Sequence, residues 1–327
     1  MLLITGGAGF LGSNLAATLE RDSRDKIVIC DYINIQKEKN LKKRNSRKIV
    51  HPKNLLHFLN KHKKEIDTIL HLGAISSTTE ENINLVAENN INLPIKIWDW
   101  CGKNNKRLIY ASSAATYGNG SKGFDDDNSL RKISALVPLN LYGLSKHIFD
   151  LLVVSYLSKK NPKPRQWVGL KFFNVYGPNE YHKGSMKSVI AQIFPKAKIG
   201  KSIKLFKSHH PKYKHGFQKR DFIWVEDCVN IIIWFLNNKN INGIFNVGTG
   251  KARTFIDLVK NIFKNMDSKS QIKYIDTPKN IRKNYQYFTE AKVNKLRKAG
   301  YRKKFTTLEK GISLYIKDYL NSSNPFR

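Results

Sequence analysis

Short apolar stretches alternate with longer amphipathic segments through the first half of the chain. Stretches with the length and β-branched character of buried strands are Leu2 to Ile4, Ile27 to Asp31, Thr68 to Leu72, Leu108 to Ala111 and Val168 to Phe172. Helical patterns follow Phe10 and cover Leu55 to Lys64, Glu80 to Cys101 and Tyr142 to Lys159. This alternation is typical of βαβ units, and it predicts an α/β fold with a Rossmann-type, doubly wound parallel sheet.

The regular alternation stops after Pro178. A basic, turn-rich stretch runs from Lys201 to Arg220, and Phe245 to Val247 then resembles a strand entering a glycine turn. We therefore expect a dinucleotide-binding Rossmann domain from residues 1–173 plus about 221–250. A smaller α/β substrate domain is expected from about 174–220 plus 251–327, with a frayed tail after Leu320. A chain of 327 residues exceeds the roughly 250 at which single cores stop growing, which also favours two domains.

Composition narrows the class of protein less than the pattern does. Lysine and arginine outnumber aspartate and glutamate by 58 to 25, which gives a net charge of +33. These cations are spread along the chain, which favours a compositional bias over a nucleic-acid-binding stripe, and they would also suit an anionic substrate. No apolar run approaches the ~20 residues that cross a bilayer, and the chain opens without a secretory signal. We therefore expect a cytoplasmic protein without membrane or specific nucleic-acid partners.

Three cysteines, Cys30, Cys101 and Cys228, are odd in number and far apart. They suggest neither a disulfide framework nor a zinc site, and we expect no bound metal.

The clearest chemical motif is the loop Thr5-Gly6-Gly7-Ala8-Gly9-Phe10-Leu11-Gly12, which directly follows the first strand. Gly6 permits a tight turn, Gly9 lets the main chain approach a pyrophosphate, and Gly12 lets the helix pack closely on the strand. Asp31 ends the next strand, where a carboxylate can accept a hydrogen bond from an adenosine ribose. Together these features predict a site for NAD or NADP.

The charges around that site leave the choice of cofactor open. Asp31 favours NAD, because its carboxylate repels the 2′-phosphate of NADP. Lys37, Lys39 and Lys53 favour NADP, since a nearby cation could neutralise that phosphate.

A second constellation predicts proton transfer. Tyr142 and Lys146 stand four residues apart, so they share one face of the expected helix. An ammonium beside a phenol stabilises the phenolate, and we therefore expect a lowered pKa for Tyr142 and an acid/base role. Ser113 follows the fourth strand, at the edge of a parallel sheet where ligands bind.

With this loop, this serine and this YxxxK pair, the chain resembles the extended short-chain dehydrogenase/reductase family. The resemblance implies hydride exchange between a nicotinamide and a sugar carbon, with Tyr142 moving the hydroxyl proton. Lys146 would hold the nicotinamide ribose, and Ser113 would orient the substrate oxygen.

Longer strings are similar to one branch of that family, the ADP-L-glycero-D-manno-heptose 6-epimerases. They are HLGAISSTTE (71–80), ASSAATYG (111–118), PLNLYGLSK (138–146), FFNVYGPNEYHKGSM (172–186), RDFIWVEDC (220–228), GIFNVGTG (243–250) and YQYFTEA (285–291). The resemblance implies epimerisation at C6 of an ADP-heptose through a ketone, in the synthesis of the lipopolysaccharide inner core. It also implies NADP as the cofactor, with NAD as the alternative, and a homo-oligomer that is often a pentamer.

Epimerisation through a ketone makes a second acid/base useful. The intermediate must present its opposite face to a fixed cofactor, which moves its oxygen, whereas proton transfer needs hydrogen-bond reach of about 2.6 to 3.2 Å. The resemblance implies that Lys183, in His182-Lys183-Gly184-Ser185-Met186, supplies this group opposite Tyr142.

The resemblance also assigns the remaining contacts. Cofactor contacts would come from Gly6, Gly9, Phe10, Leu11, Gly12, Asp31, Tyr32, Lys37, Lys53, Leu72, Gly73, Ala74, Ile75, Ser76, Asn89, Lys146, Val175 and Lys183. Substrate contacts would come from Asn174, Ser185, Gln192, Phe206, Arg220 and Tyr285. For Arg220 the assignment is chemically sensible, because a planar fork of donors suits a pyrophosphate.

Three positions depart from the pattern of that branch. Gln192 stands where a histidine is common, and Leu72 stands where a glutamate precedes the glycine. A Phe-Glu-Gly-Ser loop is replaced by Phe206-Lys207-Ser208-His209, and the segment that follows, through Lys219, is longer. The alternatives are another nucleotide-sugar enzyme, such as a UDP-hexose 4-epimerase or a dehydratase, and a catalytically idle NADP-binding protein that binds RNA.

Overall fold

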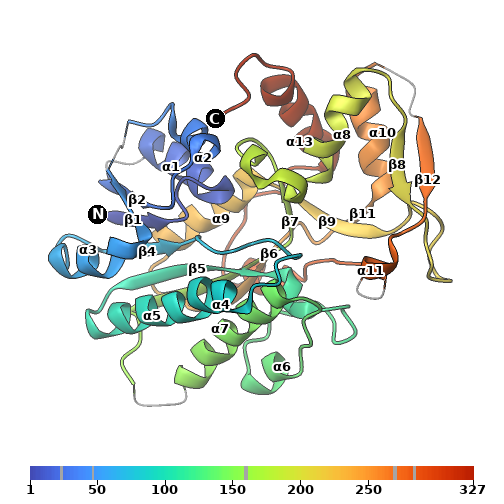
Figure 1. The fold of residues 1–327 in the computed structure, drawn as a ribbon. Coiled ribbons are helices and arrows are strands. Elements are labelled where there is room, and N and C mark those ends of the chain that lie inside the picture. The colour runs from blue at the N-terminus through green and yellow to red at the C-terminus, as the bar shows by residue number, and fades with distance from the viewer. Residues whose placement is uncertain (23–24, 46–47, 158–160, 268–270, 283–284) are drawn as a thin grey trace.

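A seven-stranded parallel sheet forms the centre of the computed structural model, which describes residues 1–22, 25–45, 48–157, 161–267, 271–282 and 285–327 (Figure 1). The strand order is β10-β6-β5-β4-β1-β2-β3. The strands are β1 (Leu2–Thr5), β2 (Ile27–Cys30), β3 (Ile49–Val50), β4 (Thr68–His71), β5 (Arg107–Ser113), β6 (Gln166–Phe172) and β10 (Gly243–Val247). The order reverses direction between β1 and β4, and in such sheets ligands bind at the carboxyl ends of the strands beside this point.

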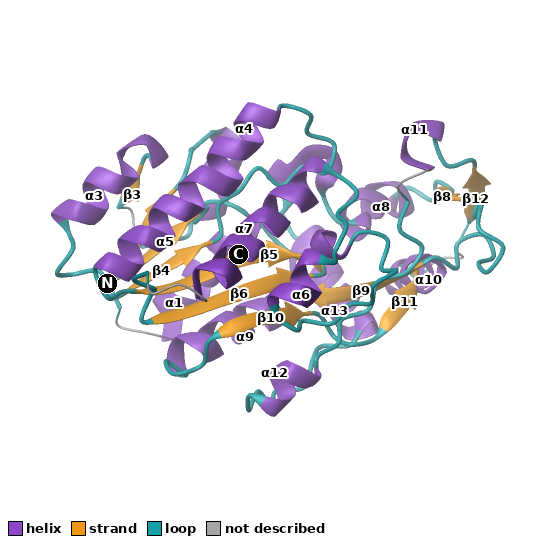
Figure 2. Cartoon of the chain, turned by 90° about the horizontal axis from the view of Figure 1, so that it is seen from below, coloured by secondary structure: helices purple, strands orange, loops and turns teal. Residues whose placement is uncertain are grey.

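Helices cover both faces of this sheet (Figure 2). One face carries α1 (Phe10–Asp22) and α9 (Val225–Asn237), and the other carries α3 (Leu55–Lys61), α5 (Leu93–Lys103) and α7 (Leu141–Leu157). Side chains alternate between the two cores, as Leu2 and Ile4 face α1 while Leu3 faces the other layer. The strands other than the two-residue edge strand β3 are thus buried on both faces, which explains their apolar runs.

The segment expected as one helix over Glu80 to Cys101 is divided in the structure. Asn82 caps α4 (Ile83–Ala87), a π-helical turn covers Glu88–Asn92, and α5 begins only at Leu93. Pro94 lacks the N–H that a regular helix would need there, so the hydrogen-bond pattern shifts. The helix expected over Tyr142 to Lys159 is α7, and residues 158–160 lie outside the described part of the chain.

A second region lies beyond the carboxyl edge of the central sheet. It holds the sheet β11-β9-β7, made of β7 (Asn174–Tyr176), β9 (Lys219–Trp224) and β11 (Ala252–Thr254), and the pair β8 (Ile203–Phe206) and β12 (Ile272–Ile275). Helices α8 (Val189–Lys198), α10 (Phe255–Asn265) and α13 (Leu308–Leu314) share its core. The stretch expected to be rich in turns therefore contains β8 and the start of β9. The domain boundaries expected from the sequence remain a prediction.

Shorter helices complete the described chain: α2 (Ile35–Leu41), α6 (Leu130–Ser134), α11 (Lys279–Arg282) and α12 (Asn294–Lys298). Among the described residues, no helix combines the length and apolar character needed to span a membrane.

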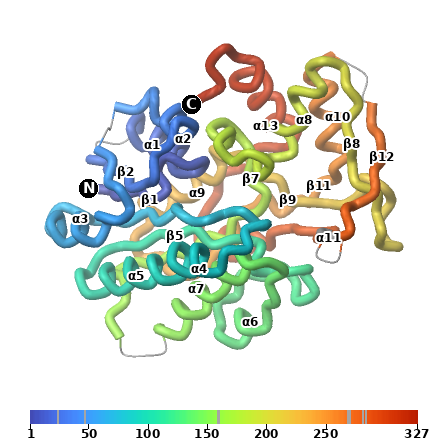
Figure 3. The backbone as a smooth tube through the Cα atoms, in the orientation of Figure 1, coloured from blue at the N-terminus to red at the C-terminus, as the bar shows by residue number. Residues whose placement is uncertain are grey.

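The expectation of a frayed tail after Leu320 is wrong. The final residues return to α1 and α2 (Figure 3), where the guanidinium of Arg327 donates to Asn14 and to Thr18, 2.9 Å away. The ring of Phe326 packs edge-on against Tyr181. Hydrogen bonds and ring contacts fix this segment, and polar composition alone did not reveal them.

Candidate active site

A cavity of about 680 Å³ opens at the carboxyl ends of the central strands. Thr5, Asp31, His71 and Ser113 line it from four of these strands or the turns that follow them, and Asn174 lines it from the second region. The cavity therefore lies where the strand order predicts a ligand site.

The glycine loop forms a cradle along one wall of this cavity. Gly6 has a φ of +66°, and a Cβ at this position would lie 2.5 Å from the main chain of Gly73 at the end of β4. A Cβ on Gly12 would lie 2.2 Å from the carbonyl oxygen of Gly6, so only glycine lets α1 begin this close to the loop. The first-turn N–H groups of a helix have no acceptor within the helix and can bind an anion. The cradle fits the pyrophosphate of a dinucleotide.

Asp31 is held by two groups of the protein itself. One carboxylate oxygen accepts from the main-chain N–H of Ala8 at 3.0 Å, and the other accepts from the ammonium of Lys37 at 2.7 Å. Asp31 is buried, while the Lys37 side chain remains 23% exposed at the cavity wall. An anion bound here meets a neutralised carboxylate and a cation.

The other expected cofactor contacts also border the cavity, with one exception. Every residue of that set lines it except Lys53, whose side chain is exposed near the cavity wall at Pro52. The strand end Leu72 to Ser76 is held by Asn90, which sequence reasoning missed. Its side-chain amide exchanges two hydrogen bonds with the main chain of Ile75, at 2.8 and 2.9 Å, and donates to Ser145 at 3.0 Å.

His71 is a second residue that sequence reasoning missed. One ring nitrogen lies 2.7 Å from the Thr5 hydroxyl, and the other is buried without a hydrogen-bond partner among the described residues. Burial, together with the nearby ammonium of Lys146, lowers the pKa of His71 to about 3. The ring is therefore neutral at physiological pH.

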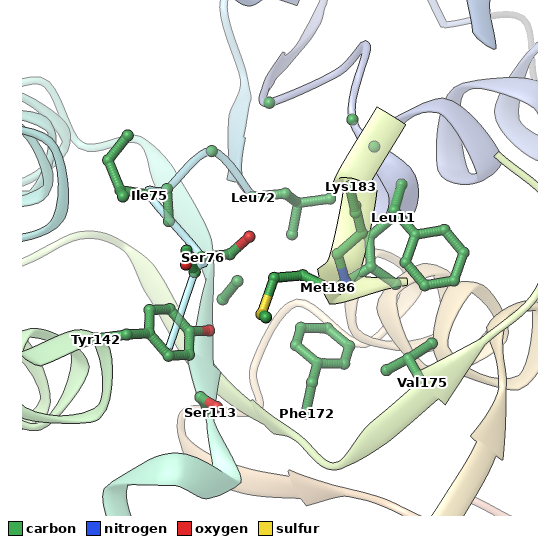
Figure 4. A pocket seen from close by; sticks show the side chains of 18 of the residues that line it. Leu11, Leu72, Ile75, Ser76, Ser113, Tyr142, Phe172, Val175, Lys183 and Met186 are labelled. Carbon is green, nitrogen blue, oxygen red and sulfur yellow. The ribbon is translucent and has the colours of Figure 1, made fainter. Parts of the chain in front are cut away.

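Tyr142 and Ser113 lie on one side of the cavity (Figure 4), and Lys146, one helical turn after Tyr142 on α7, also lines it. The side chain of Ser113 lies near the Tyr142 phenol and lowers its pKa. The expected net lowering of the Tyr142 pKa is wrong for this structure, because burial raises this pKa and Ser113 offsets only part of that rise. Burial also lowers the pKa of Lys146 to about 8, so the ammonium is itself poorly solvated.

Lys183 lies on the opposite side of the cavity from Tyr142 (Figure 4). Its ammonium lies 5.4 Å from the centre of the Phe10 ring. Burial lowers the pKa of Lys183, and the carboxylate of Glu180 partly opposes that change. Two groups able to move protons thus face each other across the cavity.

Asparagines fasten the loop that carries Lys183 to the central sheet region. The amide of Asn14 donates to the carbonyl of Pro178 at 2.9 Å, and that of Asn179 donates to Ser13 at 3.0 Å. Asn40 donates to the carbonyl of Asn179 at 3.1 Å. No short sequence motif reveals these contacts, since each joins positions more than a hundred residues apart.

Five expected substrate contacts lie outside the set that lines the cavity; only Asn174 borders it. Phe206 and Arg220 both pack against the ring of Tyr285, and Arg220 also lies 5.7 Å from the ring of Phe255, which does line the cavity. The Gln192 amide donates to the carbonyls of Ser185 and Lys187, at 3.0 and 2.7 Å. It therefore shapes the turn after Lys183.

Arg220 is buried, and it has no carboxylate partner in the described part of the chain. It is 8% exposed, its donors reach the main-chain carbonyls of Lys219 and Gln286, and no salt bridge joins it to an acid within the described ranges. A desolvated guanidinium with spare donors is suited to an anionic ligand.

The fold, the glycine cradle and the Ser-Tyr-Lys group define a class of dinucleotide-dependent enzymes that act on sugar nucleotides. Residues 2–248 match the NAD dependent epimerase/dehydratase family, and the chain belongs to this family.

Among its relatives are ADP-L-glycero-D-manno-heptose-6-epimerases of Nitratidesulfovibrio vulgaris strain DP4 and Fusobacterium nucleatum. They are 44% and 40% identical to the chain over 331 and 335 residues, covering 100% of both partners in each case. The enzyme of the same name from Helicobacter pylori has a solved structure that is 30% identical, with a TM-score of 0.80 over 97% of this chain and 95% of that one. These matches confirm the resemblance and the Rossmann-type fold, and they identify the chain as an epimerase.

Other solved structures share the fold with different substrates. A UDP-N-acetylglucosamine 4-epimerase of Methanobrevibacter ruminantium is 25% identical, with a TM-score of 0.79 over 97% of this chain and 98% of that one. A dTDP-glucose 4,6-dehydratase of Bacillus anthracis, solved with NAD, is 20% identical, with a TM-score of 0.78 over 99% and 98% of the two chains. The fold alone therefore does not determine which nucleotide sugar is the substrate, and particular side chains must do so.

Proposed function

We propose that the protein converts ADP-D-glycero-β-D-manno-heptose to ADP-L-glycero-β-D-manno-heptose by inverting C6, as a step in supplying the lipopolysaccharide inner core. The observation that carries this proposal is the placement of Lys183 opposite Tyr142. The chain that carries this pair is 44% identical over its full length to an ADP-L-glycero-D-manno-heptose-6-epimerase.

Two proton-transfer groups suit this reaction. The glycine cradle from Gly6 to Gly12 would hold NADP, which would supply the hydride acceptor for oxidation at C6 and the hydride donor for the return to the opposite face. During oxidation one of Tyr142 and Lys183 takes the hydroxyl proton, and during reduction the other donates a proton to the carbonyl oxygen. Ser113 holds the oxygen on the Tyr142 side, and exchange with solvent returns both groups to their starting states. The protein thus has a proton-transfer group for each of the two positions that the carbonyl oxygen occupies before and after the ketone rotates.

The diphosphate end of the substrate is assigned to the second region. Arg220 is a buried cation that pairs with no acid among the residues that the structure describes. It lies next to Phe255 at the cavity wall, and a guanidinium fork matches a pyrophosphate. Asn174 borders the same cavity and is held by the hydroxyl of Thr289 at 3.4 Å. The expected contacts from Ser185, Gln192, Phe206 and Tyr285 are part of this proposal, with Gln192 acting through the turn that it braces.

NADP is proposed as the cofactor in preference to NAD. Both oxygens of Asp31 accept hydrogen bonds from the protein, so the carboxylate that would bind the free ribose hydroxyls is already engaged. Lys37 adds a cation at the same place, where a 2′-phosphate would form a charge-assisted hydrogen bond.

A homo-oligomer, pentameric by resemblance, is also proposed. Exposed apolar side chains gather on and near α4 and the start of α7, and they include Ile83, Leu85, Val137 and Leu144. Light scattering of the purified protein measures the number of subunits.

Direct turnover tests the proposed function. Purified protein incubated with ADP-D-glycero-β-D-manno-heptose and NADP is expected to yield the L-glycero epimer, followed by proton NMR, without net reduced cofactor. Accumulation of reduced cofactor would contradict epimerisation. Faster turnover of UDP-galactose or GDP-mannose in parallel assays would favour the alternative sugar-nucleotide enzymes. Tyr142→Phe is expected to abolish turnover, and unchanged chemistry in this variant would remove Tyr142 from the mechanism.

A further inference from the structure

A fully buried ion pair lies beneath the residues proposed to react. The ammonium of Lys171 and a carboxylate oxygen of Asp150 are 2.7 Å apart, and neither side chain is more than 2% exposed. Asp150 follows Lys146 by four residues on α7, so the two share one helical face. Lys171 lies in β6, directly beside Ser112 of β5. Burying two charges costs desolvation free energy unless their geometry and hydrogen bonds compensate, so we expect this pair to have a role in the site.

Neighbouring side chains complete the hydrogen bonding of the pair. Asp150 accepts from the hydroxyl of Tyr110 at 3.1 Å and from that of Ser112 at 2.7 Å. Lys171 donates to the hydroxyl of Thr116 at 2.6 Å. Its ammonium also lies 5.0 Å from the centre of the Tyr117 ring. The network therefore joins β5, β6, α7 and the 3₁₀ turn Ala114–Tyr117.

Thr116 carries this network to Ser113. Its hydroxyl donates to the main-chain carbonyl of Ser113 at 2.8 Å while it accepts from Lys171. The hydroxyl of Ser113 in turn accepts from the N–H of Ala115 at 3.1 Å and lies near the Tyr142 phenol. The contacts form a closed circuit, because Tyr142 and Asp150 belong to the same helix, α7.

Close packing makes this circuit sensitive to small shifts. A Cβ on Gly143, next to Tyr142, would lie 2.8 Å from the carbonyl oxygen of Ala115. Helix α7 therefore lies almost in contact with the main chain of the turn after Ser113. At this separation a sideways shift of the turn moves Ser113 relative to Tyr142 directly.

We propose that Asp150 and Lys171, linked through Thr116, are positioning residues that hold Ser113 against Tyr142. They touch neither substrate nor cofactor and act only through these two residues. The proposal rests on the proposed function in one respect, that Ser113 and Tyr142 are the reacting groups.

The sharpest test is Thr116→Val, which keeps the size of the side chain and both charges but cuts the link to Ser113. We expect kcat to fall about tenfold with little change in KM. Because Ser113 lowers the Tyr142 pKa, moving Ser113 away raises that pKa, so the pH limb of kcat moves upward and activity recovers at alkaline pH. The charged and titratable groups around Tyr142 and the pair are Lys146 and His147 of α7, Tyr110 of β5, Tyr117, Lys171 of β6 and His71 of β4. None of these is altered in the variant.

Matched variants separate positioning from stability. Thr68→Val removes a buried threonine hydroxyl at the opposite end of the sheet, where it donates to Asp67 at 2.7 Å, and should leave kcat and the pH limb unchanged. Thr116→Ser keeps the hydroxyl and should restore both. If Thr116→Val does not fold, Ser112→Ala removes one donor to Asp150 and is measured in the same way.

Amide hydrogen exchange over residues 113–118 reports the turn without any sugar turnover. We expect faster exchange there in Thr116→Val and unchanged exchange in Thr68→Val. Unchanged exchange, an unshifted pH limb, or equal loss of kcat in both valine variants would overturn the proposal. If the wild-type protein turned over no nucleotide sugar, the proposed function would fail, while the exchange measurement would still decide this one.

Discussion

Burial distinguishes Lys183 from most of the chain's lysines, which are spread over the surface. Its ammonium sits over the Phe10 ring, and burial lowers its pKa, which favours proton exchange near neutral pH. We predict that Lys183→Met lowers kcat by about a hundredfold or more, since positioned acid/base groups contribute 10²–10⁴-fold.

The control for that prediction is Lys196→Met on α8, which removes an exposed ammonium. Initial rates of heptose epimerisation measure both variants. Equal rates for Lys183→Met and wild type would remove Lys183 from the mechanism.

Lys37 carries the prediction about cofactor choice. Lys37→Ala removes the cation that pairs with Asp31, so the freed carboxylate repels a 2′-phosphate and can accept from a ribose hydroxyl. Loss of one charge-assisted hydrogen bond should weaken NADP binding about tenfold or more relative to NAD. Isothermal titration with both cofactors measures the ratio, with Lys42→Ala, an exposed lysine at the end of the same helix, as the control. An unchanged ratio of NADP to NAD affinity would mean that Lys37 does not bind the 2′-phosphate.

His71 predicts a pH dependence of stability. Its pKa falls from 6.5 to about 3 on folding, so between these values the unfolded chain binds one proton more than the folded chain. As the pH falls below 6.5, the free energy of unfolding therefore decreases by about 1.4 kcal/mol per pH unit through this group. Urea unfolding at several pH values between about 4.5 and 6 should show a smaller change of unfolding free energy with pH for His71→Gln than for the wild type.

The control is His57→Gln, an exposed position on α3, which should keep the wild-type slope. Parallel slopes for the His71 variant and wild type would show that this ring is not the proton-linked group.

At the scale of elements, the glycine loop sets the distance between β1 and α1. Gly12→Ala places a methyl group 2.2 Å from the Gly6 carbonyl, so the helix must move and the cradle must open. Overpacking of this kind typically costs about 1–3 kcal/mol, and we expect weaker cofactor binding as well. Thermal unfolding and fluorescence titration with reduced cofactor measure both effects. Arg21→Ala, exposed at the end of the same helix, should change neither, and a Gly12→Ala variant with wild-type affinity would contradict the close fit.

Six of the seven strands of the central sheet could be predicted because both their faces are buried, so each reads as an apolar run. The seventh, β3, was missed because it has only two residues at the edge of the sheet and Ile49 is exposed. Strand β8 was missed because it is only four residues long and Lys204 interrupts its apolar residues, as in Ile203-Lys204-Leu205. The π-helical turn before α5 was also missed, since Pro94 allows either a helix start or a shifted hydrogen-bond pattern. Short elements depend on tertiary contacts more than on local pattern.

At the scale of the whole molecule, the tail joins the end of the chain to α1. Arg327 donates to Asn14 and Thr18 and lies 3.4 Å from Glu226, while Pro325 accepts from Tyr181. We predict that Arg327→Ala lowers the melting temperature by about 2 °C, which corresponds to roughly 1 kcal/mol in a chain of this size. A several-fold lower kcat should follow, because the tail also contacts Asn179 and Tyr181, which belong to the loop that carries Lys183.

Differential scanning calorimetry and initial rates check the two parts of that prediction. Arg302→Ala, which loses an exposed side chain elsewhere, is the control. A lower melting temperature with unchanged kcat would show that the tail stabilises the fold without holding the Lys183 loop.

The candidate site could be predicted where one short segment carries the chemistry. The glycine loop and the pair Tyr142 and Lys146 are local patterns, and Lys183 came from a resemblance. Asn90, His71 and the asparagine contacts of the Lys183 loop could not be predicted, because each acts on a partner brought close only by the fold. The Tyr142 pKa was misjudged for the same reason, since burial outweighs the neighbouring charge.

The packing of α1 against α9 also constrains how the chain folds as it is synthesised. The apolar face of α1, with Leu15 and Leu19, is covered by Ile231, Ile232 and Phe235 of a helix that begins only at residue 225. During translation this face stays uncovered until α9 has left the ribosome, whereas α3, α5 and α7 can cover the other face of the sheet earlier. Exposed apolar surface of this kind invites aggregation, so the nascent chain needs protection while the second half is made.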